Sequence, residues 1–74
     1  MDRVLLEQAL AQAEQHVTLS ERHIERQHEI IAALERGGHD GAKAKELLAV
    51  FLTTQATHVS GRDRLLKELK YSTK

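Results

Sequence analysis

The stretch IAALERGGHDGAKAKELL, residues 31–48, decides the fold of this chain of 74 residues. At its centre lies Gly37-Gly38-His39-Asp40-Gly41, a segment with three glycines between two runs that contain neither glycine nor proline. Five such residues are enough to reverse the direction of the chain between two helices, and they are too few to form a helix or strand themselves. The stretch therefore predicts a helix, a tight turn and a second helix.

Apolar residues recur every seven positions on both sides of this turn. They are Leu10, Val17, Ile24 and Ile31 before it, and Leu52, Val59 and Leu66 after it. A seven-residue repeat keeps one stripe of a helix facing a partner helix. We therefore predict one all-α domain, an antiparallel two-helix hairpin of coiled-coil type, with helices at about 2–36 and 42–70 and a turn at 37–41.

Individual residues predict where the helices begin and end. Asp2 is suited to cap the first helix and Asp40 the second, because a carboxylate accepts hydrogen bonds from free N–H groups at a helix start. Gly37 is expected to take the left-handed conformation that ends the first helix. Gly61 lies inside the second helix, and because the seven-residue repeat passes through it without a change of phase, we predict one continuous helix.

A turn centred on His39 pairs residues whose numbers sum to about 78, which places Leu34 opposite Ala44 and Ser20 opposite His58. Polar residues then interrupt the apolar seam halfway along the hairpin. They are His16, Ser20, His23, Gln27, Gln55, His58 and Arg62. Three interpretations stay open: a hydrogen-bonded layer that fixes register, a hydrated region without a role, and a ligand or metal site.

The chain is too short to bury a large core, and without cysteine it has neither a disulfide nor a thiolate zinc site to stabilise it. Association with a second copy into a homodimeric four-helix bundle is the simplest remaining solution. The apolar interface residues are expected to be Leu10, Val17, Ile24, Ile30, Ile31, Leu48, Phe51, Leu52, Val59, Leu65 and Leu66. The function this predicts is a non-enzymatic module for oligomerisation or for binding a protein partner that the sequence does not identify.

Charge is balanced overall but divided between the two halves. Residues 2–36 hold seven acidic and four basic residues, a net −3, and residues 42–74 hold seven basic and three acidic, a net +4. Arg62, Arg64, Lys67, Lys70 and Lys74 form a basic end, so a Rop-like nucleic-acid-binding dimer is one alternative function. The zero net charge argues against it, since nucleic-acid-binding domains are normally net basic.

Other classes of protein are disfavoured. The chain has no cysteine nucleophile, no strand that could lead into a glycine-rich phosphate loop, and no expected pocket, so we predict neither catalysis nor a cofactor. A bundle that binds metal through histidines is a further alternative, but His16 and His23 are seven residues apart, about 10 Å along a helix, too far to share one ion. With no apolar run long enough for a membrane span, the chain is expected to be soluble and cytoplasmic.

Several short runs also resemble a group of known sequences. They are His23-Ile24-Glu25-Arg26-Gln27, Ile30-Ile31, Leu34, Gly38-His39-Asp40, Leu47-Leu48, Phe51, Gln55, His58 and Arg62-Asp63-Arg64-Leu65. The pattern, from about residue 14 to 69, resembles short helical-hairpin proteins of α-proteobacteria, especially rhizobia and their relatives. This resemblance implies a bacterial cytoplasmic setting and supplies no activity, cofactor or partner.

Overall fold

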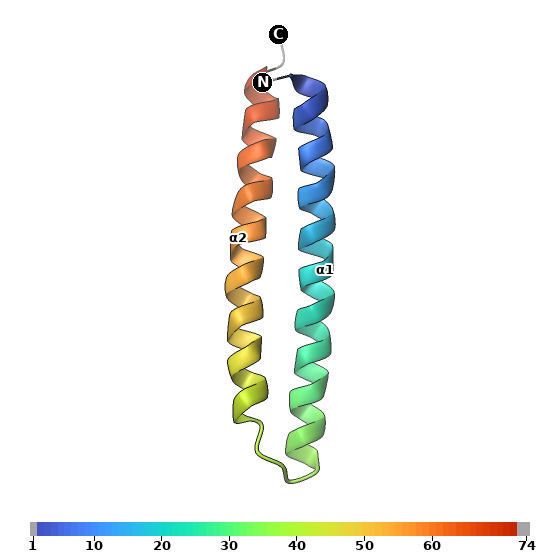
Figure 1. Ribbon diagram of the computed structural model, residues 1–74, viewed down its shortest axis with the longest axis vertical. Coiled ribbons are helices and arrows are strands. Elements are labelled where there is room, and N and C mark those ends of the chain that lie inside the picture. The colour runs from blue at the N-terminus through green and yellow to red at the C-terminus, as the bar shows by residue number, and fades with distance from the viewer. Residues whose placement is uncertain (1, 73–74) are drawn as a thin grey trace.

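A computed structural model describes residues 2–72 as two long antiparallel helices (Figure 1). Helix α1 spans Arg3–Arg36 and helix α2 spans Ala42–Ser72, which continues unbroken through Gly61. Together they form a rod of 59 × 14 × 13 Å, with the turn at one end and the start of α1 beside the end of α2 at the other. The prediction of an all-α helical hairpin is confirmed.

Both predicted caps are present. The Asp2 side chain accepts a hydrogen bond of 3.0 Å from the Val4 N–H, and Asp40 accepts one of 3.0 Å from the Ala42 N–H. Each satisfies one of the N–H groups that the first turn of a helix leaves without an intrahelical partner. An exposed ion pair between Lys45 and Glu35, 3.0 Å long, joins the two helices just beyond the turn.

The prediction for Gly37 was wrong, and the neighbouring glycine takes its role. Gly37 has φ −81°, whereas Gly38 has φ +76°. The Gly38 N–H donates to the Glu35 carbonyl at 3.1 Å and the His39 N–H donates to the Leu34 carbonyl at 2.9 Å. This pair of bonds is the Schellman motif, in which the left-handed residue follows the cap. Because Gly37 extends the helical conformation by one residue, the left-handed position falls on Gly38.

Replacing Gly38 should therefore destabilise the hairpin. We expect Gly38→Ala to lower the free energy of unfolding by about 1 kcal/mol, because an alanine in the left-handed region meets its own carbonyl oxygen. Gly41→Ala is the matched control: Gly41 does not have positive φ, and the added methyl would lie 3.8 Å from Glu35 Cγ and 4.0 Å from Ile31 Cγ2. Urea denaturation of both variants checks this, and equal stabilities would contradict it.

The stripe predicted for the first helix is the one α1 turns toward α2. Leu6, Val17 and Ile31 are its buried apolar side chains, with Ser20 and Gln27 buried between them. Leu10, Ile24 and Leu34 of the same stripe are half-buried. The seven-residue repeat of Leu10, Val17, Ile24 and Ile31 therefore located the inner face of α1 correctly.

The inner face of α2 agrees with the predicted one in part. Leu52 and Leu66 are 47% and 46% exposed, while Phe51 and Leu65, predicted at the interface together with them, are more covered. The half-buried stripe of α2 consists of Ala44, Leu48, Phe51, Gln55, His58, Arg62, Leu65 and Leu69. Of the apolar interface residues predicted on α2, Leu48, Phe51, Val59 and Leu65 are half-buried. Leu52 and Leu66 are exposed, so α2 turns the side of Phe51 and Leu65 toward α1.

The pairing of the two helices is also shifted by one turn. His58 was expected opposite Ser20 but stacks on His16, four residues earlier, and Ala44, expected opposite Leu34, receives a hydrogen bond from Gln27. The reason lies at Gly41, which is buried against the Ile31 and Glu35 side chains. After the end of α1, residues 37–41 run back alongside its last turn before α2 begins. As a result, α1 extends beyond the start of α2 at the turn (Figure 1).

Candidate functional site

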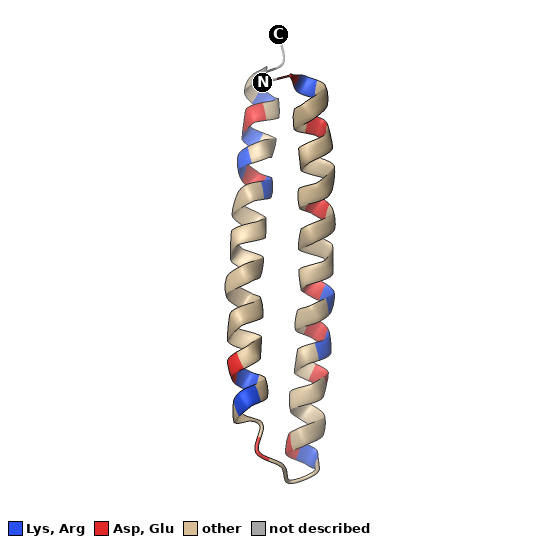
Figure 2. Ribbon diagram, viewed as in Figure 1, with Lys and Arg blue, Asp and Glu red and all other residues tan. Residues whose placement is uncertain are grey.

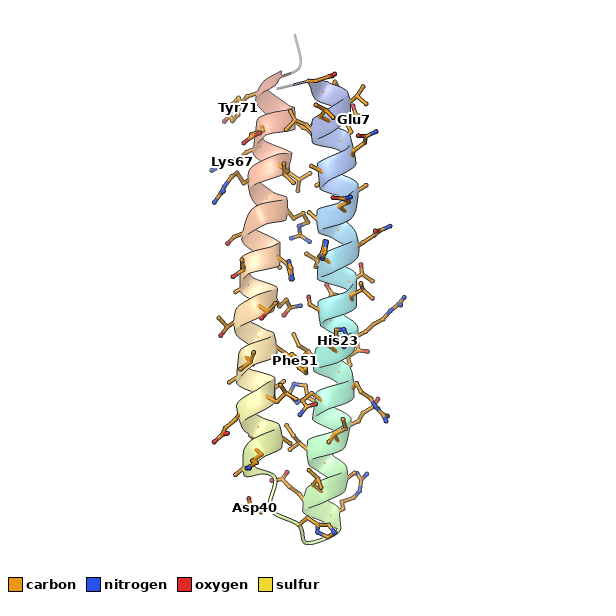
Figure 3. All side chains as sticks on the ribbon, in the orientation of Figure 1. Glu7, His23, Asp40, Phe51, Lys67 and Tyr71 are labelled. Atoms are coloured by element: carbon orange, nitrogen blue, oxygen red, sulfur yellow. The ribbon has the colours of Figure 1, made fainter. Side chains whose placement is uncertain are left out.

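A shallow groove of about 330 Å³ runs between the helices near the middle of the rod. Its walls are His16, Leu19, Ser20 and His23 from α1, and Val50, Phe51, Thr54 and His58 from α2. Figure 3 shows His23 and Phe51 approaching each other across the space between the helices. Leu19 and Val50 remain 50% and 57% exposed, so the groove opens onto an apolar surface.

Three of the five histidines lie in this groove. The His16 and His58 rings stack with centroids 5.1 Å apart and planes at 21°. The His23 ring lies 5.8 Å from Phe51, tilted by 33°. The sequence predicts these histidines in the middle of the hairpin, and the structure pairs His58 with His16. Two uncharged rings in such a stack bury apolar area, whereas two protonated rings would repel each other.

The buried polar side chains near the groove already have partners. Ser20 Oγ donates to the Val17 carbonyl at 2.8 Å, and Gln27 Nε2 donates to the Ala44 carbonyl at 2.9 Å. Among residues 2–72, no buried side-chain nitrogen or oxygen lacks a hydrogen-bond partner. No buried polar atom in this part of the chain therefore points to a missing ligand.

The predicted polar residues do not form one layer. Gln27 bonds near the first turn of α2, whereas Arg62 lies in the half of α2 that leads to its end and contacts Asp63 at 3.2 Å. Gln55 is half-buried between them. Only His16, Ser20, His23 and His58 come together, as lining of the groove. Within the described residues, no three His, Asp or Glu side chains converge to hold a metal ion.

The side of α2 that borders the groove belongs to an uncharged segment. Residues 47–61 contain no Lys, Arg, Asp or Glu, and Figure 2 shows this as an unbroken tan stretch of α2. The hydroxyls of Thr53, Thr54 and Thr57 each donate to the carbonyl four residues earlier, at 3.0, 3.0 and 3.3 Å. Because these protons are used within the helix, they need no water or partner.

The two sides of α1 differ in chemistry. Ala9, His16, His23 and Ile30, spaced by seven, flank the buried stripe on the side of the groove. Glu7, Glu14 and Glu21, also spaced by seven, flank it on the other side. Glu35 belongs to the same series of glutamates. Its ion pair with Lys45 shows that Lys45 of α2 lies on the same side of the hairpin as this series. One face of the hairpin is therefore apolar and histidine-bearing, and the opposite face is acidic along α1.

The residues of the predicted basic end do not all face the same way. Arg62 lies in the seam and contacts Asp63, Arg64 borders a shallow hollow beside Gly61, and Lys67 projects away from the hairpin (Figure 3). Asp63 and Glu68 lie among them in the chain. Lys74 lies outside the described residues. A phosphate backbone is bound by basic groups that act on the same surface, and Arg62, half-buried in the seam and paired with Asp63, does not share the exposed side of Arg64 and Lys67.

We accordingly expect binding to duplex DNA or structured RNA to be no tighter than micromolar at physiological salt. Fluorescence anisotropy with labelled oligonucleotides measures it, with a triple variant of Arg62, Arg64 and Lys67 to alanine as control. Submicromolar, sequence-selective binding that the triple variant loses would contradict this expectation and favour the Rop-like alternative.

Leu19, Val50 and Thr54 line the groove, but sequence analysis did not single them out. A search for the longest uncharged run would have found Val50 and Thr54, which lie in residues 47–61. Leu19 had no such signal, because it lies outside the seven-residue stripe and only two residues before the charged pair Glu21 and Arg22. Its place became evident only with the pairing of α1 and α2.

No protein-family model, curated protein or solved structure matches the chain. Within residues 2–72, neither helix contains a segment that is both long and apolar enough to cross a membrane.

Proposed function

We propose that this protein is a non-enzymatic, self-associating helical hairpin, whose dimer serves as an oligomerisation or protein-interaction module. The observation that carries the proposal is the uncharged face around the groove, where Leu19 and Val50 are half-exposed next to Phe51. We call this surface, made by Ala9, His16, Leu19, His23 and Ile30 of α1 with Leu47, Val50, Phe51, Thr54 and His58 of α2, the groove face.

The small core of the single hairpin supports the proposal. Among the described residues, only Leu6, Val17 and Ile31 are buried apolar side chains. A core of this size rarely gives a chain without disulfides a stable fold. Packing a second hairpin against the first would cover apolar side chains beside the seam that are exposed to water in a single hairpin. The groove face is suited to such stacking because it presents apolar side chains without a charge in its centre.

The opposite face is the competing surface, and its chemistry makes it the weaker candidate. It carries the exposed Leu52 and Leu66, but the flanking side of α1 presents Glu7, Glu14 and Glu21. A two-fold contact through this face would bring acidic side chains of both copies together with few bases on α1 to neutralise them. The groove face has no carboxylate in the same positions.

The proposal is tested by the molar mass of the protein in solution and by the dependence of its melting temperature on concentration. We expect light scattering after size exclusion to give twice the mass of the chain, 8.4 kDa, at micromolar concentration. Because dimerisation couples to folding, the melting temperature should rise with protein concentration. A folded monomer whose melting temperature does not change with concentration would exclude self-association.

A further inference from the structure

We infer that the second copy docks on the groove face with its turn at the opposite end of the rod, so that His16 and His58 of one copy meet His23 of the partner subunit. This inference rests on the proposed self-association and adds the orientation of the two copies and a site that neither copy completes alone.

The two helices share one centre on the groove face. On α1, Ala9, His16, His23 and Ile30 are spaced by seven and are symmetric about the point between Leu19 and Ser20. On α2, Leu47, Thr54 and Gly61 are spaced by seven and symmetric about Thr54. Gly61 lies just beyond the groove face, where it borders the hollow that Thr57 and Arg64 line. A two-fold axis perpendicular to the rod can place each series against the same series of the partner subunit. A single axis does this for both helices only if the two centres lie at the same height along the rod.

The ring contacts place them at the same level. His16 stacks on His58 and His23 lies beside Phe51, so the midpoint of His16 and His23 is level with the midpoint of Phe51 and His58, next to Thr54. One two-fold axis can therefore pass through both centres. It would stack α1 on α1 and α2 on α2 of the partner, antiparallel in each case.

The side chains that this axis brings together match in size and polarity. Ala9 meets Ile30 of the partner subunit and Leu47 meets Gly61 of the partner subunit, a small residue against a large one in both pairs. A Cβ added to Gly61 would meet no atom within 4 Å, so nothing within the hairpin itself requires a glycine there. A glycine inside a helix weakens it by about 1 kcal/mol. The space that Gly61 leaves for the partner's Leu47 would explain why a glycine occupies this position.

The other two-fold arrangement, with both turns at one end, gives poorer contacts. It stacks α1 on α2 of the partner at equal levels, which sets Ile30 against Lys43 of the partner subunit and Ala9 against Arg64 of the partner subunit. The arrangement inferred here brings Lys43 level with the partner's Arg64, but both side chains are exposed and can extend into water.

The completed site holds three imidazoles: His16 and His58 of one copy with His23 of the partner subunit, and the same set again by symmetry. Of the charged groups around it, Arg62 lies one turn beyond His58 in the seam and pairs with Asp63 at 3.2 Å, and Arg22, next to His23 in the chain, borders Leu19 on the outer side of α1. Glu21 belongs to the opposite side of α1, and Glu14 lines a separate hollow with Leu19 and Arg22 on its outer side. Positively charged imidazoles gathered at one place in the interface would repel one another, so acid should weaken the dimer.

Spin labels test the orientation, since the chain has no cysteine and each introduced one is unique. With a label on His39→Cys, in the turn, we expect an interspin distance close to the length of the rod, 59 Å. A label on Thr53→Cys, at the middle of the outer side, is the control and should give less than about 40 Å in either orientation. A dimer with a short His39→Cys distance overturns this inference and leaves self-association intact, whereas a monomer overturns both.

The imidazole site is tested by the pH dependence of dimer dissociation. Between pH 7.5 and 5.5 the dimer Kd should rise about tenfold or more, because imidazoles take up protons in this range. The triple variant His16→Gln, His23→Gln, His58→Gln should lose this dependence, and the control His28→Gln, His39→Gln should keep it. In His23→Glu the new carboxylate lies beside His16 of the partner subunit, so that dimer should tighten as pH falls. A wild-type Kd independent of pH, or a His23→Glu dimer that weakens in acid, would overturn the site.

Discussion

Changing Leu19 and Val50 together to glutamate is expected to turn the dimer into a monomer. Both side chains are half-exposed in the hairpin, 50% and 57%, and would be covered by the second copy. Burying the remaining half of each contributes about 1 kcal/mol, and a dimer contains four such side chains. Losing these contacts and bringing four carboxylates into an apolar interface should raise the dimer Kd at least about a thousandfold.

The matched control places the same charges on the opposite face. Leu52 and Leu66 are 47% and 46% exposed, so Leu52→Glu with Leu66→Glu makes an equivalent change in apolar area and charge. We expect this variant to dimerise nearly as the unmodified chain does, as measured by analytical ultracentrifugation over a range of concentrations. If the control dissociates and the Leu19 and Val50 variant does not, the acidic face is the interface and the groove face is not.

The fold of this protein could be predicted from its sequence because the deciding signals are local. Three glycines in five residues end one helix, Asp2 and Asp40 begin the two helices, and a regular stripe from Leu6 to Leu34 determines which side of α1 is covered. Each of these signals depends on residues within one or two turns of the helix. None requires knowledge of how the two helices are placed against each other.

The inner face of α2 could not be predicted in the same way, because this helix carries two neighbouring stripes. Leu52, Val59 and Leu66 form one series with a spacing of seven, and Phe51, His58 and Leu65 form another, one position away. The path of the turn decides between them. With Gly41 buried against Ile31, α2 starts in an orientation that places the second series toward α1.

The candidate site depended on the same unpredicted step. The sequence indicated a polar middle section with three histidines, but a pairing centred on His39 set His58 against Ser20. Moving α2 by one turn stacks His58 on His16 and brings Phe51 beside His23, and this closes the groove. A shift of one turn changes every contact across the seam, while it leaves the fold class unchanged.

The hydrogen bond from Gln27 to Ala44 is the contact best placed to hold this register, and Gln27→Glu should be the most destabilising single substitution in the seam. Gln27 is 5% exposed, and its Nε2 donates to the Ala44 carbonyl at 2.9 Å. A carboxylate has nearly the same shape but no donor, so it would place a buried charge against the oxygen of that carbonyl. We expect the free energy of unfolding to fall by about 2–4 kcal/mol at pH 7.5.

Acid should reverse much of that loss, which separates the electrostatic cause from a change in packing. Once protonated, the introduced carboxyl group regains a donor for the Ala44 carbonyl, so the folded variant holds a proton that the unfolded chain has released at the same pH. Its stability relative to the unmodified chain should therefore rise as pH falls from 7.5 toward 4.5. Gln55→Glu, at a half-buried position of the same seam, is the control and should lose less. Urea denaturation of the three proteins at both pH values measures these differences, and a Gln27→Glu deficit that is the same at both would mean that shape, and not the lost donor, is responsible.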